Sequence, residues 1–160
     1  MEKQNAQYVI LSLGTNTCHA VNMSLAAVRL RRTVGGMRCS RRLWTEPVAL
    51  PDNAQFPPGT LFLNMLVAGW VNLTHDELHT LLKQIERECG RNDADKARGI
   101  IRIDIDILKY GDTISHAADW QRDYVKTLIN DVTSPPSPSS RPAPELPPCG
   151  SSAASEPSGS

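Results

Sequence analysis

The chain has 160 residues, which is enough for one domain with a packed core. Its 17 basic and 17 acidic residues give a formal net charge of zero, so the overall charge does not indicate a nucleic acid or an anionic membrane as a partner. The polar first residues and the absence of a long apolar run argue against a signal peptide or a membrane span, so we expect a cytoplasmic protein.

The first third of the chain predicts two strands joined by a helix. Residues 8–13 form a short apolar run, YVILSL, that is typical of a buried strand. The turn GTN follows, and the next segment predicts a helix that runs to about residue 33, where two glycines are expected to end it. We expect its apolar side to consist of Val21, Leu25 and Val28 together with Ala26 or Leu30. Residues 37–45 predict a second strand.

The middle of the chain predicts a long loop, a strand and a second helix. Residues 46–59 contain four prolines, and a loop of this length inside a compact domain is more often functional than not. Residues 60–71 predict a strand that is apolar except for Asn64. The sequence from Thr74 to Glu77 fits a capping box, and leucines and an isoleucine then recur at helical spacing.

The rest of the chain predicts a strand, a helix and a tail. Residues 99–108 predict the fourth strand, and Asp119 is expected to open a last helix. This order predicts an α+β fold with a ferredoxin-like βαββαβ antiparallel sheet, helices on one face and the other face free to carry a site. Residues 133–160 are rich in Pro and Ser and poor in large apolar residues, so we expect a disordered C-terminal tail after a domain of residues 1–132.

The segment RIDIDI at residues 102–107 carries the clearest chemical signal. Strand alternation puts its isoleucines on one face and Arg102, Asp104 and Asp106 on the other. Two carboxylates at this spacing, with Cα atoms about 7 Å apart, can converge on Mg²⁺. The alternative is a solvated strand face on which Arg102 balances the aspartates.

Basic residues precede this strand in the sequence. Glu86 is expected on the second helix, Arg91 just beyond its end, and Lys96 and Arg98 in the connection to the aspartate strand. Carboxylates that hold a metal beside arginines that hold phosphate oxygens are what a Mg²⁺-nucleotide site requires. A solvated polar loop is the alternative, and the absence of a G-x-x-x-x-G-K-[ST] motif excludes a P-loop enzyme.

Four motifs in order resemble the family of 6-hydroxymethyl-7,8-dihydropterin pyrophosphokinase of folate synthesis. They are LSLGTN near the start, WTEP after the second strand, FLNMLV in the third strand, and QIERECGR with GIIRIDIDILKYG toward the end. The resemblance spans most of residues 7–132 and implies the same ferredoxin-like fold. It also implies transfer of pyrophosphate from ATP to the hydroxymethyl group of the reduced pterin, with release of AMP.

The resemblance implies roles for particular residues. Asp104 and Asp106 would bind two Mg²⁺ ions that bridge the triphosphate, and these two residues with Arg91 would form the catalytic group. Thr45, Asn64 and Tyr124 would contact the pterin. The residues expected to contact ATP are Glu86, Arg91, Arg98, Arg102, His116 and Arg122.

The sequence departs from the family pattern in four places; two of them are Asp93, where the family has a basic residue after the GR, and a longer loop before Asn64. The family has a Trp and an Arg just before the metal strand, where this chain has Arg98 and Ile101, with Arg102 displaced by one position. The C-terminal part is also shorter, and its segment HAADWQRDY supplies His116, Arg122 and Tyr124. Trp120 and Tyr124 share a helical face, so a plain core role for Tyr124 stays open.

We therefore expect a monomeric enzyme with small-molecule substrates, ATP and the reduced hydroxymethylpterin, and with no nucleic acid or membrane as a partner. Two other hypotheses stay open. One is a different two-metal enzyme that uses a nucleotide on a ferredoxin-like sheet, because paired strand carboxylates serve that chemistry too. The other is a non-catalytic binding module, because the fold does not fix the function.

Overall fold

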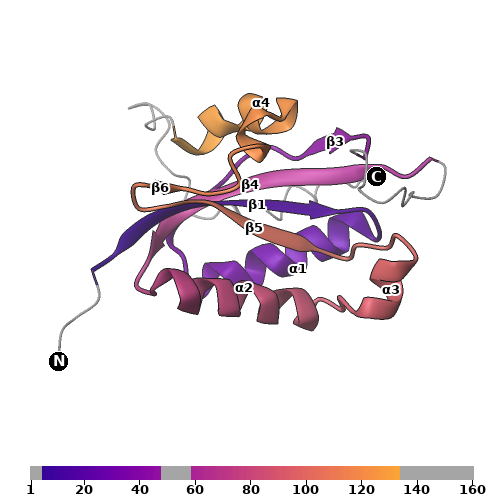
Figure 1. Ribbon diagram of the computed structural model, residues 1–160, viewed down its shortest axis with the longest axis horizontal. Coiled ribbons are helices and arrows are strands. Elements are labelled where there is room, and N and C mark those ends of the chain that lie inside the picture. Colours follow the sequence, from indigo (N-terminus) through magenta and orange to yellow (C-terminus); the bar gives the residue numbers. More distant parts are fainter. Residues whose placement is uncertain (1–4, 48–58, 134–160) are drawn as a thin grey trace, which may run out of the picture.

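The computed structural model describes residues 5–47 and 59–133, which form one antiparallel sheet with helices on both faces (Figure 1). The strand β1 runs through the middle, between β4 and β5, and β3 pairs with β4 beside β2. This order confirms the predicted ferredoxin-like arrangement, although the predicted second strand is divided into β2 and β3. The order across the sheet is β2 (Gly35–Cys39), β4 (Phe62–Val71), β1 (Gln7–Thr15), β5 (Asp104–Tyr110) and β6 (Thr113–Ile114), with β3 at Leu43–Thr45.

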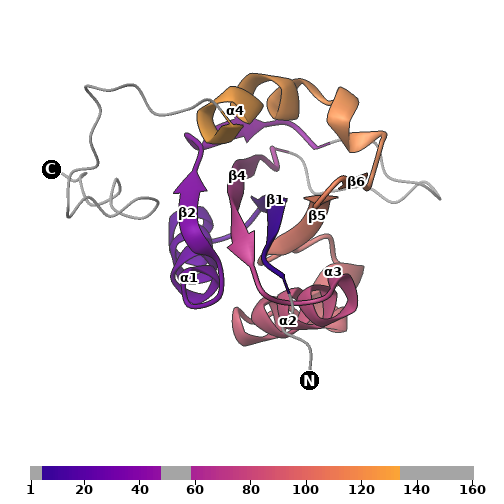
Figure 2. The same cartoon turned by 90° about the vertical axis from the view of Figure 1, so that its left-hand side faces the viewer.

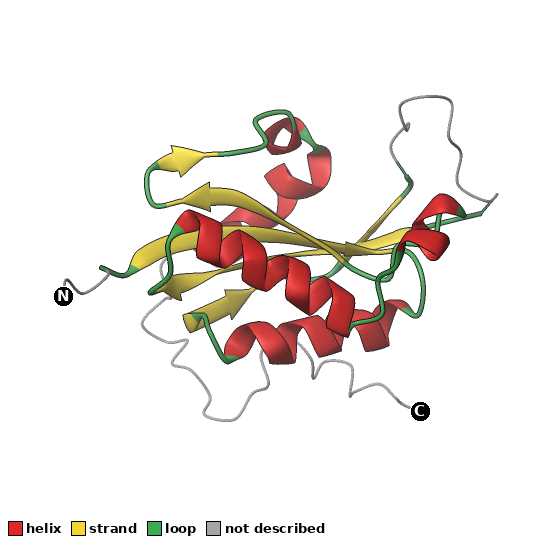
Figure 3. Ribbon diagram, turned by 60° about the horizontal axis from the view of Figure 1, so that its bottom comes forward, coloured by secondary structure: helices red, strands yellow, loops and turns green. Residues whose placement is uncertain are grey.

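Helices α1 (His19–Arg31) and α2 (His75–Glu88) lie side by side across one face of the sheet (Figure 3). The apolar residues of β1, β4 and β5 alternate, and those that point to this face form the larger core with the two helices. The isoleucines of the aspartate strand belong to this core, as their spacing predicts. They are Ile103, Ile105 and Ile107.

The predicted apolar side of α1 is partly wrong. Ala26 and Leu30 are buried as expected, but Val21 and Val28 are 68% and 54% exposed. The buried stripe instead begins at Met23 and includes Ala27. Apolar residues occur on more than one side of this helix, so its sequence fits several orientations and packing against the sheet selects one. The two glycines expected to end the helix lie in β2, after a helix end at Arg31.

The capping box that opens α2 is confirmed. The hydroxyl of Thr74 accepts a hydrogen bond from the Glu77 amide at 3.1 Å, and the Glu77 carboxylate accepts one from the Thr74 amide at 2.9 Å. The predicted apolar stripe is buried at Leu78, Leu82 and Ile85. The sequence therefore predicts both the start and the orientation of this helix.

The last helix lies on the opposite face, which the prediction left free (Figure 2). A short 3₁₀ turn at Asp119–Gln121 leads into α4 (Asp123–Thr133), whose Val125, Leu128 and Val132 are buried. These side chains pack against one end of the second face of the sheet, at Ile10, Leu66, Ala68 and Leu108. The other end of that face, which is polar, is not covered by α4.

Two predicted segments lie largely or wholly outside the described residues, namely the proline-rich loop and the C-terminal tail. The domain boundary at residue 132 therefore stays a prediction. None of the helices in the described part of the chain is long and apolar enough to span a membrane.

Candidate active site

The strand pairing brings polar residues of β4, β1 and β5 next to one another on the second face of the sheet, at two successive positions on that face of β1. Gly14 of β1 lies opposite Asn64 on one side and Asp104 on the other. One pair further along, Ser12 lies opposite Asp106. Neighbouring strands are about 4.8 Å apart, so Asn64 and Asp104 stand on either side of Gly14 with Cα atoms about 10 Å apart.

A cleft of about 620 Å³ lies over these polar residues. Its floor is the sheet, and Gly14 adds no side chain to it. A Cβ atom at this position would lie 3.4 Å from the Asn64 amide oxygen, so the glycine keeps the space between the polar residues open. The walls come from β3, β4 and the segment that leads into α4. The lining residues used below are Ser12, Gly14, Thr45, Asn64, Asp104, Asp106, Asp119, Arg122 and Tyr124.

Asp104 is close enough to Asp106 to influence the protonation of the Asp106 carboxyl. Burial, together with the negative charge of Asp104, raises the pKa of Asp106 from its ordinary value of 3.8 to about 7. Lys83 and His116 oppose the rise, but their effect is smaller. The fold thus places the Asp106 carboxyl where burial and the charge of Asp104 disfavour its deprotonated form.

This donor set fits a hard divalent cation. Both groups are carboxylates, and Asp104 is 40% exposed at the cleft. A cation between them would remove the repulsion that raises the Asp106 pKa. Within the described residues no group of three or more potential ligands surrounds one point, so the remaining ligands of such an ion would have to be water or substrate oxygens. Mg²⁺ commonly binds proteins in this way, through one or two carboxylates.

Arg91 fixes Asp104 from behind the cleft. Its Nη1 donates to the Asp104 carboxylate at 2.8 Å and to the Ile103 carbonyl at 3.1 Å. The guanidinium is only 18% exposed, and the nearby acidic groups raise its pKa although burial opposes this. Arg91 therefore keeps its charge and holds the Asp104 side chain in one orientation.

Asn64 presents one half of its amide to the cleft. Its Nδ2 donates to the Thr45 hydroxyl at 2.8 Å and to the Leu43 carbonyl at 3.2 Å. Within the described residues its Oδ1 has no hydrogen-bond donor, although Asn64 is buried. An orientated amide acceptor at the floor of a cleft can accept a hydrogen bond from a ligand.

The segment before α4 places a second group of charged residues at the cleft. Asp119 accepts a hydrogen bond from Arg122 Nε at 2.7 Å and lies 3.8 Å from His116 Nδ1. Tyr124 makes a 3.0 Å hydroxyl contact with Ser12, next to Asp106. Burial raises the pKa of Tyr124, so this hydroxyl stays protonated at neutral pH.

The sequence model of the 7,8-dihydro-6-hydroxymethylpterin-pyrophosphokinase family matches residues 10–134. The chain belongs to this family. It is 32% identical over 139 residues to a 2-amino-4-hydroxy-6-hydroxymethyldihydropteridine pyrophosphokinase of Porphyromonas gingivalis, which covers 78% of this chain and 89% of that protein. It is also 31% identical over 142 residues to a folate synthesis bifunctional protein of Arabidopsis thaliana, which covers 82% of this chain. The chain spans 28% of the length of that plant relative.

Six of the residues that the family resemblance singled out line the cleft, and they come from four separate elements. They are Thr45, Asn64, Asp104, Asp106, Arg122 and Tyr124. Arg91 and His116 do not line it but contact Asp104 and Asp119, which do. The roles of these residues toward pterin, ATP and metal stay predictions.

Three further residues expected at the ATP site lie away from the cleft lining. Arg98 and Arg102 both bind the carboxylate of Asp95 in the short helix α3 (Asp93–Ala97), at 2.9 and 2.8 Å. Glu86 is buried on the α2 side of the sheet. Their contacts are therefore with the protein itself in this structure, and a role in ATP binding stays a prediction for each.

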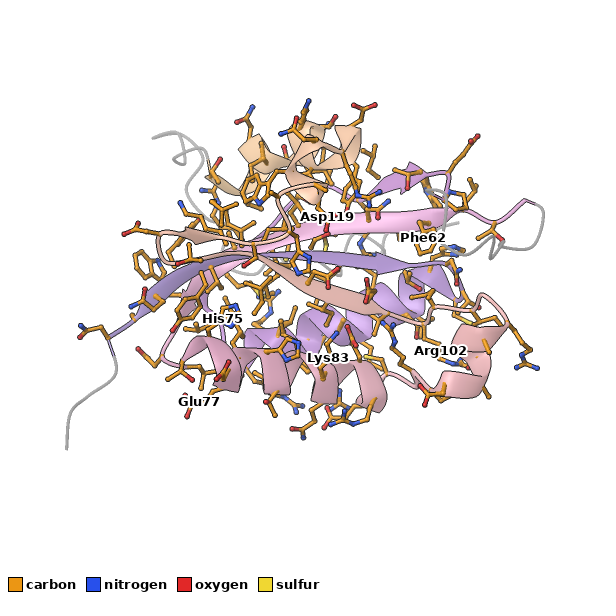
Figure 4. All side chains as sticks on the ribbon, viewed as in Figure 1. Phe62, His75, Glu77, Lys83, Arg102 and Asp119 are labelled. Carbon is orange, nitrogen blue, oxygen red and sulfur yellow. The ribbon has the colours of Figure 1, made fainter. Side chains whose placement is uncertain are left out.

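The expected placement of Arg102 beside the two aspartates is wrong. The strand begins at Asp104 rather than at residue 99, so the alternation does not extend to Arg102. Its side chain packs over Gly90 at the end of α2, and Figure 4 shows it on the α2 side of β5, with Asp119 on the other side. Arg102 therefore does not balance the charge of the paired aspartates.

The sequence reasoning missed several cleft residues. Ser12 and Gly14 lie in the quoted LSLGTN motif, but only the strand pairing reveals them as neighbours of the aspartates. Asp119 is expected only as a helix start, although His116 and Arg122 each lie three residues from it, a spacing at which side chains of a helical turn can meet. Asn16 was also missed. It holds the segment before β5 against β1 through the Gly99 carbonyl at 2.8 Å and the Ile101 amide at 2.7 Å.

Proposed function

We propose that this chain transfers pyrophosphate from ATP to 6-hydroxymethyl-7,8-dihydropterin in folate biosynthesis, with Mg²⁺ as cofactor and AMP as the second product. The observation that carries the proposal is one cleft that brings the Asn64 amide and the paired carboxylates of Asp104 and Asp106 together. Membership of the pyrophosphokinase family supports it. The cellular compartment and the monomeric state stay predictions.

The two halves of the cleft suit the two substrates. The Asn64 acceptor and the Tyr124 ring can recognise a flat, polar heterocycle by a hydrogen bond and by ring contact. Asp104 and Asp106 would hold Mg²⁺ about two strand spacings away, where the metal would neutralise negative charge on the triphosphate. Arg122, the arginine of the lining, can donate to phosphate oxygens.

Catalysis by this arrangement is mainly a matter of positioning. The sheet holds the two halves of the cleft at a fixed distance from each other. The hydroxymethyl group of the pterin can therefore be aligned with the β-phosphorus of ATP. The burial that raises the Asp106 pKa also keeps the local dielectric low, which strengthens every charge interaction at the metal.

The test uses purified protein, Mg-ATP and the reduced hydroxymethylpterin. We expect AMP to form only when both substrates and Mg²⁺ are present, and we expect Asp104→Asn and Asp106→Asn each to remove turnover while the chain stays folded. Release of pyrophosphate instead of AMP would indicate a different two-metal enzyme. Absence of Mg-ATP binding in calorimetry would favour a non-catalytic binding module and contradict the proposal.

A further inference from the structure

The stretch of β5 that carries both aspartates has a free edge. On one side it pairs with β1, at Asp104, Ile105 and Asp106. On the other side β6 reaches only Lys109 and Tyr110, so within the described residues no strand accompanies β5 next to the aspartates. A strand edge without a partner leaves amide and carbonyl groups unpaired and can shift in position.

Two charged side chains take the place of the missing strand. The Glu86 carboxylate accepts a hydrogen bond from the Ile105 amide at 2.7 Å. Arg91 donates to the Ile103 carbonyl at 3.1 Å. Ile103 and Ile105 point their backbone groups to the same edge, because backbone polar groups alternate sides along a strand. Glu86 and Arg91 thus form the pair of contacts that a neighbouring strand would make, and we name this pair the β5 edge clamp.

The end of α2 brings the clamp residues together. The Arg91 amide donates to the Glu86 carbonyl at 3.0 Å, and the Gly90 amide donates to the Arg87 carbonyl at 2.9 Å. These two bonds form a Schellman motif, and Gly90 supplies the positive φ of +102° that it requires. The spacing E-x-x-x-G-R is therefore the spacing at which one helix end points a carboxylate and a guanidinium at the same strand edge.

The clamp carboxylate is buried beside two cationic side chains. Glu86 is 3% exposed, and its carboxylate is surrounded by Lys83 at 3.3 Å and by Arg91 at 3.5 Å. Figure 4 shows Lys83 on α2, the helix that carries Glu86. Removing this buried carboxylate would take the acceptor from the Ile105 amide and an ion-pair partner from Lys83 and Arg91, although Arg91 would keep its contact with Asp104.

We propose that Glu86 is a positioning residue for the metal, acting through the β5 backbone rather than through ATP. Its contact with the Ile105 amide fixes the peptide unit that joins Asp104 to Ile105, the first of the two peptide units between the aspartates, so it influences the direction in which the two carboxylates point. Its partner Arg91 fixes the Asp104 side chain directly. The part of this inference that concerns the metal rests on the proposed function.

The test compares Glu86→Leu and Glu86→Gln with Ile107→Ala. Ile107 lies on β5 and faces the same core as Ile105, but it is not part of the β5 edge clamp. Its variant is therefore a control for a general loss of stability. The first readout is hydrogen exchange of the Ile105 amide by NMR. We expect at least tenfold faster exchange in Glu86→Leu, a smaller change in Glu86→Gln, which keeps an acceptor oxygen, and no selective change in Ile107→Ala.

The second readout is binding of Mn²⁺ alone, without nucleotide. We expect the Mn²⁺ dissociation constant to rise about tenfold or more in Glu86→Leu, less in Glu86→Gln, and to change little in Ile107→Ala. Equal Mn²⁺ affinity of Glu86→Leu and the unaltered chain would overturn the inference, and so would an equal loss in Ile107→Ala. If the unaltered chain binds no Mn²⁺, the proposed function fails, and the exchange rate of Ile105 alone decides whether the clamp orders the strand.

Discussion

Asp106 is held where its charge is unfavourable. Its pKa of about 7 lies above the ordinary value of 3.8, because its carboxyl is buried beside Asp104. Arg91 pairs with Asp104, and among the described residues no cation forms an ion pair with Asp106. A carboxyl with a raised pKa contributes stability below its unfolded pKa, near 4, and loses that contribution as the pH rises through about 7.

The unfolding temperature in a metal chelator should therefore fall as the pH is raised from 5 to 8, and Asp106→Asn should flatten this decline because the amide does not titrate. At pH 8 we expect Mg²⁺ to raise the unfolding temperature of the unaltered chain but not of Asp106→Asn. Thermal unfolding followed by tryptophan fluorescence measures both effects. The same pH dependence in both proteins would show that another group is responsible.

Asn64 should discriminate between the two substrates. Its Oδ1 is orientated by the contacts of Nδ2 with Thr45 and Leu43, so Asn64→Ala removes an acceptor that is already fixed in place. We expect the dissociation constant of the reduced pterin to rise by at least about tenfold, which is about 1.4 kcal/mol, with little change for Mg-ATP. Separate titrations of the two ligands measure this. A parallel loss for both ligands would indicate that Asn64 supports the cleft as a whole.

At the scale of elements, the end of α2 has an effect well beyond the helix. Gly90 carries a φ of +102°, and a Cβ atom there would lie 2.8 Å from the Arg102 side chain. The same residue closes the Schellman motif from which Arg91 reaches Asp104. Helix termination and the geometry of the aspartates are therefore linked through one glycine.

Gly90→Ala should lower the free energy of unfolding by about 1–2 kcal/mol, because an L side chain is strained at this φ. It should also weaken Mn²⁺ binding, since the Arg91 guanidinium would be displaced. Urea unfolding and metal titration measure the two effects. Gly59→Ala is a matched control, because Gly59 also has a positive φ, of +82°, and no atom lies within 4 Å of its added Cβ. Equal metal affinity of Gly90→Ala and Gly59→Ala would show that the end of α2 does not influence the metal site.

The elements were predicted well where the sequence pattern fits only one arrangement. The capping box at Thr74 and the alternation of isoleucines with aspartates in β5 each have one physical solution, and both are confirmed. Helix α1 has apolar residues on several sides, so Val21 and Val28 could be placed only by packing. Arg102 could not be placed because the strand start depends on contacts made by Asn16, 85 residues away in the chain from Ile101.

At the scale of the whole molecule, the two sheet faces are divided between stability and chemistry. One face is covered by α1 and α2, and the second is covered by α4 at one end only. The open end is strongly acidic. Among the described residues, five carboxylates and one arginine, Arg122, line the cleft; the carboxylates belong to Glu46, Asp104, Asp106, Asp119 and Asp123. A chain of zero net charge thus presents an acidic site to the triphosphate that we propose as its substrate.

Nucleotide binding should for this reason depend on the metal. We expect ATP without Mg²⁺ to bind at least about a hundredfold more weakly than Mg-ATP, because the carboxylates repel the triphosphate until cations neutralise them. Binding of the uncharged pterin should change little on removal of Mg²⁺. Calorimetry with and without chelator measures both. Comparable ATP affinity in the two conditions would show that the triphosphate binds away from the aspartates.

Some of the residues that line the cleft can be predicted from the sequence. Asn64, Asp104 and Asp106 are polar residues in otherwise apolar strands, and that contrast marks them in the sequence. Asp119 lies in a connecting segment rich in polar residues, so its carboxylate does not stand out from its neighbours in the sequence. Its contact with Arg122 is local, between residues three apart in the chain, but its place at the cleft follows from the path of the chain over the second face.

Gly14 has a consequence for how this protein can change. The distance between the pterin half and the metal half of the proposed site is set by backbone pairing across β1 and not by any side chain. Point substitutions can alter what each half binds but not how far apart the halves are. One residue inserted between Leu11 and Gly14 would reverse which side chains of that segment face the cleft and which face the core. This part of β1 can therefore accept substitutions but cannot change in length.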